Sequence, residues 1–336
     1  MGIRIAVVGA TGAVGQEMIK ILEERNFPVD DLICLAAPSE AGTPVYFRGN
    51  TFKARAVSAD AFKSADIAMF AVGSEVSKEL APLAVKNNCL VIDNSYAFRL
   101  QEGVPLVVPE VNPEDIALHQ GIIANPNCST TIMVVAINPI HQVSPLKRVV
   151  VSTYQAVSGA GKAGLDELEQ NARASINGEE SQANVFQYQI AFNLIPHIDE
   201  FVDEGYTREE MKMVWETRKI MHAPTMKIAA TAVRVPVYRS HSESISLETE
   251  QPLTIDQVRE ILSRSPGVVV QDDPTTNTYP MPLYSSNHDE VFVGRIRPDI
   301  SAENGIVLWV CADQIRKGAA TNAIQIAEVA VDRGLY

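Results

Sequence analysis

The chain has 336 residues, of which 46% are hydrophobic and 21% charged, and its 41 acidic and 28 basic side chains give a formal net charge of −13. This composition excludes a disordered chain, a collagen-like repeat and a disulfide-rich miniprotein, and at ~150 residues per domain the length predicts two domains. The excess of negative charge disfavours binding to nucleic acid or to anionic membranes, so a small anionic substrate would need a local cluster of basic side chains.

The cysteines and the N-terminal residues indicate the cellular compartment of the protein. The four cysteines form no C-x-x-C pair, a spacing that predicts neither a bound metal nor a disulfide framework. No hydrophobic run approaches the ~18 residues that a membrane-spanning helix needs. Residues 1–4 lead directly into a strand-like segment, which leaves no room for a signal peptide. We therefore expect a cytoplasmic protein with reduced thiols.

The first half of the chain alternates predicted strands with predicted helices. Residues 3–8 form a short apolar run suited to a buried parallel strand, and a glycine-containing loop, a helix over 16–25 and a strand over 32–37 complete a βαβ unit. Further strands are predicted over 67–72, 90–94, 106–108 and 122–124, and helices over 76–86 and 113–119. The alternation predicts a Rossmann-like, doubly wound parallel sheet, which we interpret as a dinucleotide-binding domain over residues 1–130.

The loop after the first strand carries glycines at 9, 12 and 15, a GxxGxxG spacing rather than GxGxxG. Between a strand and a helix, exposed backbone N–H groups and the helix dipole favour a phosphate, although a tight turn without a ligand is the alternative. Gly9 and Gly12 would let a pyrophosphate approach the backbone, and Gly15 would allow close packing of the helix on the sheet. The loop residues predicted to bind the cofactor are Gly9, Thr11, Gly12, Ala13 and Val14.

The segment after the second strand normally selects NAD or NADP. Here Ser39 could donate to a 2′-phosphate, whereas Glu40 could bind a ribose hydroxyl or face solvent, and no arginine follows before Arg48. The residues themselves leave the choice between the two cofactors open.

Cys128 is the candidate nucleophile. A strand-like segment leads into the polar stretch 125–131 and then into an apolar helical run, so the thiol lies near a helix N-terminus, which favours the thiolate. Lowering a thiol pKa from about 8.5 to about 7 requires roughly 2 kcal/mol, which the helix and a cationic histidine could supply. The alternative is a buried structural thiol, the role that we expect for Cys34, Cys89 and Cys311 because each lies in or beside an apolar strand.

The second half has longer predicted strands, over 148–156, 227–238, 243–248, 290–297 and 305–312, with irregular stretches over 175–206 and 274–286. Alternation predicts that Val233, Val235 and Val237 share one face of their strand and that Arg234 and Tyr238 share the other. This pattern predicts an α+β domain with a mixed sheet, responsible for catalysis and assembly, over residues 131–313. A C-terminal helix over 314–336 is expected to pack back on the first domain.

Several motifs occur in one order along the chain: GATGAVG at 9–15, NPNCST at 125–130, QAVSGAG at 155–161, EEMK at 209–212, RVPVYRSH at 234–241 and KGAATN at 317–322. Together they resemble the aspartate-β-semialdehyde dehydrogenase family over essentially the whole chain. The resemblance implies a reversible, phosphate-dependent and NADP-dependent interconversion of L-aspartate 4-semialdehyde and L-aspartyl 4-phosphate through a cysteine thioester. Such a reaction serves the biosynthesis of lysine (through diaminopimelate), threonine and methionine.

The resemblance also implies a role for individual residues. Cys128 matches the nucleophile, His241 the general acid/base and Gln155 the residue that orients the reacting group. Arg234 and Glu209 match the residues that bind the α-carboxylate and the α-amine of the substrate. The residues that match the phosphate-binding set are Arg99, Asn127 and Lys212. The residues that match positions bordering the nicotinamide are Asn322, Ser158, Gly159 and Gly161.

Local chemistry agrees with several of these roles and leaves plainer alternatives. The fork of Arg234 suits bidentate binding of a carboxylate, although a solvent-facing arginine would give the same pattern. Glu209 and Lys212 are three residues apart and would share a helix face, where a surface ion pair is the alternative. Arg234 and His241 are seven residues apart, so a straight strand would place them on opposite faces, and a common site requires a turn or bulge near Ser240.

The resemblance implies NADP, and we expect this cofactor. Members of the family that use NADP often carry an arginine where this chain has Ser39, so the missing arginine and the presence of Glu40 make NAD the alternative cofactor. Two other functions are kept open: a related acyl-phosphate reductase such as N-acetyl-γ-glutamyl-phosphate reductase, and a catalytically silent nucleotide-binding paralogue. The expected partners are the small-molecule substrate, inorganic phosphate and a second copy of the chain in a homodimer, with a dimer of dimers as a further assembly.

Overall fold

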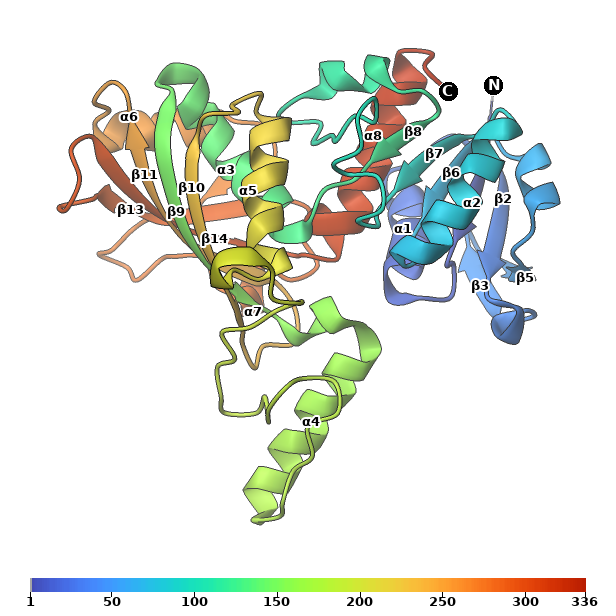
Figure 1. Cartoon of the computed structure of the whole chain (residues 1–336), viewed down its shortest axis with the longest axis horizontal. Coiled ribbons are helices and arrows are strands. Elements are labelled where there is room, and N and C mark those ends of the chain that lie inside the picture. The colour runs from blue at the N-terminus through green and yellow to red at the C-terminus, as the bar shows by residue number, and fades with distance from the viewer. Residues whose placement is uncertain (1) are drawn as a thin grey trace. The chain divides into compact units, whose positions relative to one another are not determined.

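The computed structural model describes residues 2–336. The chain divides into two compact units, one made of Met1–Asn127 with Gly318–Tyr336 and the other of Cys128–Lys317 (Figure 1). Each unit has its own six-stranded sheet.

The first unit contains a parallel sheet in the order β5-β2-β1-β6-β7-β8. Its strands are β1 (Ile3–Val8), β2 (Val29–Ala36), β5 (Arg55–Ala56), β6 (Ile67–Phe70), β7 (Leu90–Asp93) and β8 (Ile122–Ala124), and its helices are α1 (Ala13–Glu24), α2 (Ser74–Lys86) and α8 (Thr321–Asp332). A small antiparallel hairpin, β3 (Pro44–Phe47) and β4 (Asn50–Lys53), lies outside this sheet. The predicted Rossmann-like architecture is confirmed, and the strand order reverses between β1 and β6, where such sheets bind ligands.

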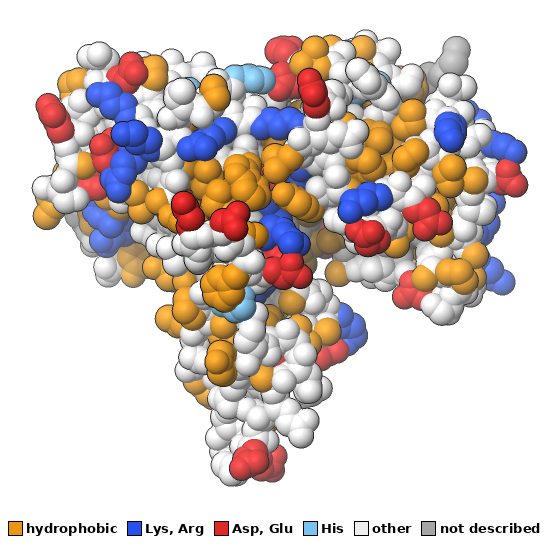
Figure 2. All heavy atoms as spheres, in the orientation of Figure 1, with side chains coloured by type: hydrophobic (Ala, Val, Ile, Leu, Met, Phe, Trp, Pro, Cys, Tyr) orange, Lys and Arg blue, Asp and Glu red, His pale blue; other side chains and the backbone are white. Residues whose placement is uncertain are grey.

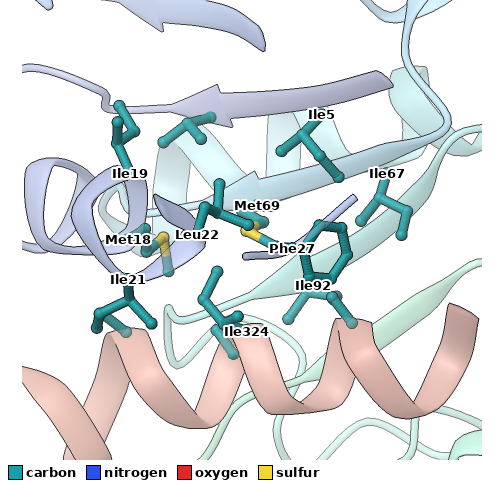
Figure 3. Packing of buried hydrophobic residues seen from close by; sticks show 14 of the residues in the cluster. Ile5, Met18, Ile19, Ile21, Leu22, Phe27, Ile67, Met69, Ile92 and Ile324 are labelled. Atoms are coloured by element: carbon teal, nitrogen blue, oxygen red, sulfur yellow. The ribbon is translucent and has the colours of Figure 1, made fainter. Parts of the chain in front are cut away.

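The core of this unit explains why the C-terminal helix belongs to it. Apolar residues of α1, among them Met18 and Leu22, meet Ile5 and Ile92 of the sheet, and Ile324 of α8 packs into the same cluster (Figure 3). The carboxylate of Glu328 in α8 also pairs with the guanidinium of Arg25, at 2.7 Å for both contacts. Amphipathic α8 thus covers an apolar surface that the rest of the unit would leave exposed.

Two predicted elements of the first unit take other forms. Residues 113–119 form a 3-10 helix, Pro113–Leu118, instead of an α-helix. The predicted strand over 106–108 is reduced to one bridge between Leu106 and Ala124. The side chain of Asn112 accepts from the backbone N–H of Val108 and donates to the carbonyl of Leu106, so a side chain makes the bonds that a neighbouring strand would have made.

The second unit contains a mixed sheet in the order β10-β9-β11-β14-β13-β12, as the sequence predicts. Its strands are β9 (Leu146–Gln155), β10 (Lys227–Arg234), β11 (His241–Thr249), β12 (Val268–Val270), β13 (Val291–Pro298) and β14 (Gly305–Ala312). Helices α3 (Cys128–Val143), α5 (Arg208–Ile220) and α6 (Ile255–Ser263) pack on these strands. From Val149 along β9 and from Glu243 along β11 every second residue is buried, which defines the face that the core covers.

Helix α4 (Gly161–Asn177) and the segment that follows it extend away from the sheet of this unit (Figure 1). Hydrophobic side chains are exposed on this extension, and Figure 2 shows them at its surface. The exposed members are Ile176, Tyr188, Phe192, Leu194 and Phe201. A surface of this composition is typical of contact with another protein chain.

The predicted strand over 227–238 is too long. Strand β10 ends at Arg234, where Pro236 follows and cannot donate to a strand ladder, so the alternation expected through Tyr238 is wrong. Residues 235–240 instead form a turn in which Ser240 has a φ of 72°. The turn or bulge that the spacing of Arg234 and His241 requires is therefore present.

The irregular stretches and the C-terminal helix also differ in detail. Residues 175–177 are still part of α4, and the stretch over 274–286 contains a short helix, α7 (Pro282–Ser285). The C-terminal helix over 314–336 is interrupted, because Arg316–Ala320 form a π-helical turn before α8. Between residues 2 and 336, no helix is long and apolar enough to cross a membrane, and no group of three or more metal-ligating side chains gathers as a metal site would require.

Candidate active site

Three predicted site residues meet where neighbouring strands of the second unit begin or end. Gln155 is the last residue of β9 and Arg234 the last of β10, and the two are paired in the parallel register. His241 begins β11 on the other side of β9. All three side chains are buried, so the core-facing side of this sheet changes from apolar to polar residues at this end.

Arg234 is held by backbone and aromatic contacts. Its Nη1 donates to the carbonyl of Ala156 at 2.8 Å, and its guanidinium lies 5.7 Å from the centre of the Phe186 ring. Burial lowers the pKa of Arg234, and this is opposed by the Glu209 carboxylate and by Cys128. A fixed guanidinium with remaining N–H groups is suited to bind a carboxylate.

His241 is fully buried and neutral. Burial, reinforced by the positive charge of Arg234 and opposed by Glu209, lowers the pKa of His241 to about 3. Its Nδ1 accepts the backbone N–H of Ala156 at 3.0 Å, so the single proton of the neutral ring is on Nε2. No protein group described by the structure is hydrogen-bonded to Nε2. The ring therefore offers a buried, uncommitted donor.

Cys128 is the first residue of α3, a helix of 16 residues, and it is half-exposed. The other three cysteines are buried, and desolvation raises the pKa of Cys34 to about 11 and that of Cys89 and Cys311 to about 12. A thiol at a helix N-terminus is more readily ionised than a thiol inside a sheet. Cys128 is thus the cysteine best placed to react.

Glu209 and Lys212 share one face of α5, as their spacing predicts. The Nζ of Lys212 lies 3.0 Å from Oε2 of Glu209, and the Nε2 of Gln155 donates to its Oε1 at 3.3 Å. The helix begins here because Thr207 and Glu210 form a capping box. The structure thereby joins Gln155, Glu209 and Lys212 in one cluster, in which Gln155 and Glu209 are buried and Lys212 is partly exposed.

Asp199 belongs to the same cluster, because its Oδ2 lies 2.7 Å from Nζ of Lys212. No motif or spacing in the sequence marks Asp199 as a site residue. Asp199 lies in an irregular segment where no period or motif marks any side chain, so only a three-dimensional structure could have identified it.

The loop after β9 lies against these residues. A Cβ at Gly159 would be 2.8 Å from Nη1 of Arg234, so the glycine allows the loop to approach this guanidinium closely, and 3.6 Å from Cε1 of His241, an ordinary contact distance. Ser158 is buried and accepts from Nε2 of Gln314, and Gly161 has a φ of 73°. The three loop residues predicted to border the nicotinamide are therefore in the same unit as His241.

The other predicted binding residues belong to the first unit and gather around Asn125, just after β8. Arg99 donates from Nε to the carbonyl of Asn125 at 2.9 Å and from Nη2 to that of Asn94 at 2.8 Å. Asn322 is fully buried and donates to Oδ1 of Asn125 and to the carbonyl of Val107. Asn127, also buried, directly precedes Cys128 in the chain.

The glycine loop has the form that a phosphate-bearing nucleotide requires. Gly9 has a φ of 87°, and a Cβ there would be 2.4 Å from the carbonyl oxygen of Ala71; at Gly15 it would be 2.1 Å from that of Gly9. At Gly12 the nearest atom would be 3.5 Å away, which leaves open space over the N-terminus of α1. Residues 11–14 are exposed or half-exposed there, which fits a ligand bound through backbone N–H groups.

The segment expected to select the cofactor touches this loop. Pro38–Glu40 form an exposed 3-10 turn after β2, and the hydroxyl of Thr11 donates to Oε2 of Glu40 at 2.7 Å. Ser39 is exposed beside them. A serine hydroxyl and a carboxylate are therefore exposed beside the glycine loop.

Comparison with known proteins identifies the family. Residues 4–119 match the model "Semialdehyde dehydrogenase, NAD binding domain", and residues 137–317 match "Semialdehyde dehydrogenase, dimerisation domain". The aspartate-semialdehyde dehydrogenases of Aquifex aeolicus and Bacillus subtilis are 54% and 50% identical to the chain, over 100% and 97% of each sequence. The crystal structure of aspartate semialdehyde dehydrogenase II from Vibrio cholerae, complexed with ASA, has a TM-score of 0.97 at 46% identity and 99% coverage of both chains. The chain, with its nucleotide-binding and dimerisation domains, belongs to the aspartate-semialdehyde dehydrogenase family of oxidoreductases.

Proposed function

We propose that the protein catalyses the NADP-dependent and phosphate-dependent interconversion of L-aspartate 4-semialdehyde and L-aspartyl 4-phosphate through a thioester on Cys128. The reaction would serve the biosynthesis of lysine, threonine and methionine. The observation that carries the proposal is the buried cluster of Gln155, Glu209, Arg234 and His241, in the unit that begins with the thiol. The names of the relatives and the ASA bound by the Vibrio cholerae enzyme support the substrate.

The charges of the cluster suit an amino-acid substrate. Arg234 would bind the α-carboxylate and Glu209 the α-ammonium, two groups of opposite charge on one carbon. Gln155, hydrogen-bonded to Glu209, would orient the aldehyde. Lys212, with Arg99 and Asn127, would bind phosphate. An acetylated amine, as in the related reductase, carries no positive charge, so the Glu209 carboxylate favours the aspartyl substrate.

In the oxidative direction the Cys128 sulfur forms a bond with the aldehyde carbon, the electron pair of the carbonyl moves to its oxygen, and the thiol proton passes to that oxygen to give the hydroxyl of the thiohemiacetal. The Nε2–H of His241 would donate to that oxygen. When the thiohemiacetal is oxidised, His241 takes the hydroxyl proton, which requires the tautomer with the proton on Nδ1 and therefore release of the Ala156 hydrogen bond. A phosphate oxygen then bonds to the thioester carbon, and the Cys128 thiolate leaves.

NADP, when bound, supplies the hydride acceptor. Gly9, Thr11, Gly12, Ala13 and Val14 would hold its phosphates at the start of α1, and Ser39 its 2′-phosphate. Ser158, Gly159, Gly161 and Asn322 would border the nicotinamide. Because Glu40 lies where a positive side chain would favour the 2′-phosphate, NAD is the alternative cofactor.

The domain roles complete the proposal. Residues 1–130 would bind the nucleotide, and residues 131–313 would carry out catalysis and dimerisation. The hydrophobic side chains exposed on and after α4 support contact with a second chain in a homodimer. The four cysteines are free thiols, which supports action in the reducing environment of the cytoplasm.

The test is NADP⁺ reduction with L-aspartate 4-semialdehyde, measured with and without phosphate and compared with NAD⁺ and with N-acetylglutamate semialdehyde. We expect turnover only with phosphate or a close analogue, and a loss of at least ~10³-fold in Cys128→Ser. Cys89→Ala is the matched control, because this thiol is buried in the first unit. Phosphate-independent turnover, or an active Cys128→Ser enzyme, would refute the mechanism.

A further inference from the structure

Lys212 is shared between two carboxylates. Its Nζ is 2.7 Å from Oδ2 of Asp199 and 3.0 Å from Oε2 of Glu209. The side chains are only 13% exposed for Lys212, 24% for Asp199 and 7% for Glu209. Solvent and salt screen these partly buried charges much less than charges at the surface. The competition of the two carboxylates for Lys212 therefore affects how strongly Glu209 can bind another cationic group.

Backbone hydrogen bonds before and after Asp199 in the sequence hold its segment in place. On one side the backbone N–H and carbonyl of Ile195 pair with those of Arg234 at 3.0 and 2.8 Å. On the other side the N–H of Arg208, at the start of α5, donates to the carbonyl of Glu200 at 2.8 Å. The rings of His197 and Phe201 stack across the segment, with their centres 4.3 Å apart. Asp199 is thus anchored to the two elements that carry Arg234 and Glu209.

The backbone of Asp199 supports the same conclusion. Its φ of 69° lies in the left-handed region, which costs free energy for a residue other than glycine and persists where the surrounding structure enforces it. The nearest other cation, Arg208, lies 3.9 Å from Asp199 and pairs more closely, at 2.6 Å, with Glu200. Lys212 is therefore the main ionic partner of Asp199.

The consequence concerns Glu209. Its Oε1 accepts from Gln155 and its Oε2 from Lys212, so an ammonium of the protein already occupies the carboxylate that would bind the ammonium of the substrate. We propose that Asp199 is a positioning residue that shares the ammonium of Lys212 with Glu209, weakens the pairing between Lys212 and Glu209, and so makes the charge of Glu209 available to the α-ammonium of the substrate. This inference rests on the proposed function.

The first test is Asp199→Asn, which removes the charge, keeps the shape and tolerates the left-handed backbone. The ammonium of Lys212 then no longer has the charge of Asp199 beside it and interacts more strongly with Glu209, so we expect the KM for L-aspartate 4-semialdehyde to rise about fivefold while kcat stays within about twofold. The matched control is Glu200→Gln, the adjacent acid, whose side chain is 73% exposed and pairs with Arg208. Its KM is expected to match that of the wild type.

A structural defect in Asp199→Asn would raise the KM for every substrate, whereas the proposed mechanism raises the KM only for substrates that carry an α-ammonium group. Succinic semialdehyde lacks the amine, so its KM should be the same in the wild type and in Asp199→Asn. The effect should also disappear when Lys212 is already replaced: Lys212→Met and the double variant should have equal KM values for the semialdehyde. A change that persists with succinic semialdehyde or in the Lys212→Met background would overturn the inference.

A second readout does not depend on turnover. Although burial lowers it, the pKa of Lys212 is raised by Glu209 and Asp199. It should therefore fall in Asp199→Asn, as measured by NMR of the Lys212 ammonium with Lys212→Met for assignment. A wild-type protein that does not turn over L-aspartate 4-semialdehyde would refute the proposed function alone. An unchanged KM in an active Asp199→Asn enzyme, or an unchanged Lys212 pKa, would refute the role of Asp199 alone.

Discussion

His241 occupies a position in which an imidazole does not readily become charged. The ring is fully buried, the Arg234 guanidinium lies nearby, and Nδ1 already accepts the N–H of Ala156. A histidine in water has a pKa near ~6.5 and is partly cationic at neutral pH, so the environment here changes the chemistry of the residue. The neutral ring offers its Nε2–H as a hydrogen-bond donor and carries no positive charge.

We predict that His241 stays neutral from pH 8 to pH 5, with its proton on Nε2, because its pKa is lowered to about 3. Nitrogen-15 NMR of the imidazole rings distinguishes the two neutral tautomers from the cation, and His241→Gln assigns the resonances. A titration of His241 near pH 6.5, or a spectrum with the proton on Nδ1, would contradict the observed hydrogen bond.

At the scale of elements, the sequence predicts well where one local pattern dominates. The first strand and the glycine loop form as expected, and the helix after them begins at Ala13 instead of residue 16. The strands predicted over 148–156 and 243–248 are present as β9 and β11. The failures have local causes that a hydrophobic pattern does not contain. The Asn112 side chain replaces a strand partner at 106–108, and Pro236 ends the pairing of β10 that the valine alternation predicts to continue.

Two capping boxes allow the positioning of α5 to be tested. Thr207 caps α5 through Glu210, and Thr254 caps α6 through Gln257 in the same way. We predict that Thr207→Ala and Thr254→Ala each lower stability by about 1 kcal/mol. Only Thr207→Ala should also raise the KM for L-aspartate 4-semialdehyde, by about threefold, because the first turn of α5 carries Glu209. Chemical denaturation and steady-state kinetics give both quantities, and an equal KM in the two variants would show that the cap does not position Glu209.

Two glycines of the loop are required for different reasons: Gly15 for the packing of the helix, and Gly12 for the approach of a ligand. A Cβ at Gly15 would overlap the carbonyl oxygen of Gly9 at 2.1 Å, whereas one at Gly12 would be 3.5 Å from the same atom. We predict that Gly15→Ala lowers stability by roughly 1–3 kcal/mol and weakens nucleotide binding. Gly12→Ala should change stability by less than about 0.5 kcal/mol, so any weakening there reports on the approach of the ligand. Thermal unfolding and calorimetric titration with NADP⁺ measure the two effects, and equal destabilisation by both variants would refute the packing argument.

At the scale of the whole molecule, residues far apart in the chain become neighbours through strand register, which limits what a single sequence can predict. Cys128 and Arg234 are conspicuous locally, one before an apolar helix and the other inside an apolar strand. Gln155, Glu209 and Lys212 carry no local signal and were singled out only through the family resemblance. Asp199 and Glu243 escaped both approaches, because burial and partners are properties of the folded chain and not of the segments that contain these residues.

Glu243 influences the stability of the molecule as a function of pH. It lies on the core-facing side of β11, two residues after His241, in register with Thr153 and Val310. The side chain is fully buried, and neither carboxyl oxygen is hydrogen-bonded to any group within residues 2–336. Burial raises the pKa of this carboxyl well above its ordinary value. The native protein therefore keeps a proton that the unfolded chain releases above about pH 4.3, so this residue lowers the stability as pH rises.

We predict that Glu243→Gln, which keeps the shape but cannot ionise, gains stability over the wild type as pH increases. The difference should grow by up to about 1.4 kcal/mol per pH unit between pH 5 and the pKa of the folded carboxyl. Calorimetric unfolding at pH 5, 6, 7 and 8 measures it, with Glu248→Gln as the matched control. Glu248 is on the opposite face of the same strand, where its carboxylate pairs with Arg148 at 2.7 Å. A difference that does not change with pH would show that Glu243 is ionised in the folded protein and that its charge has a partner in solution.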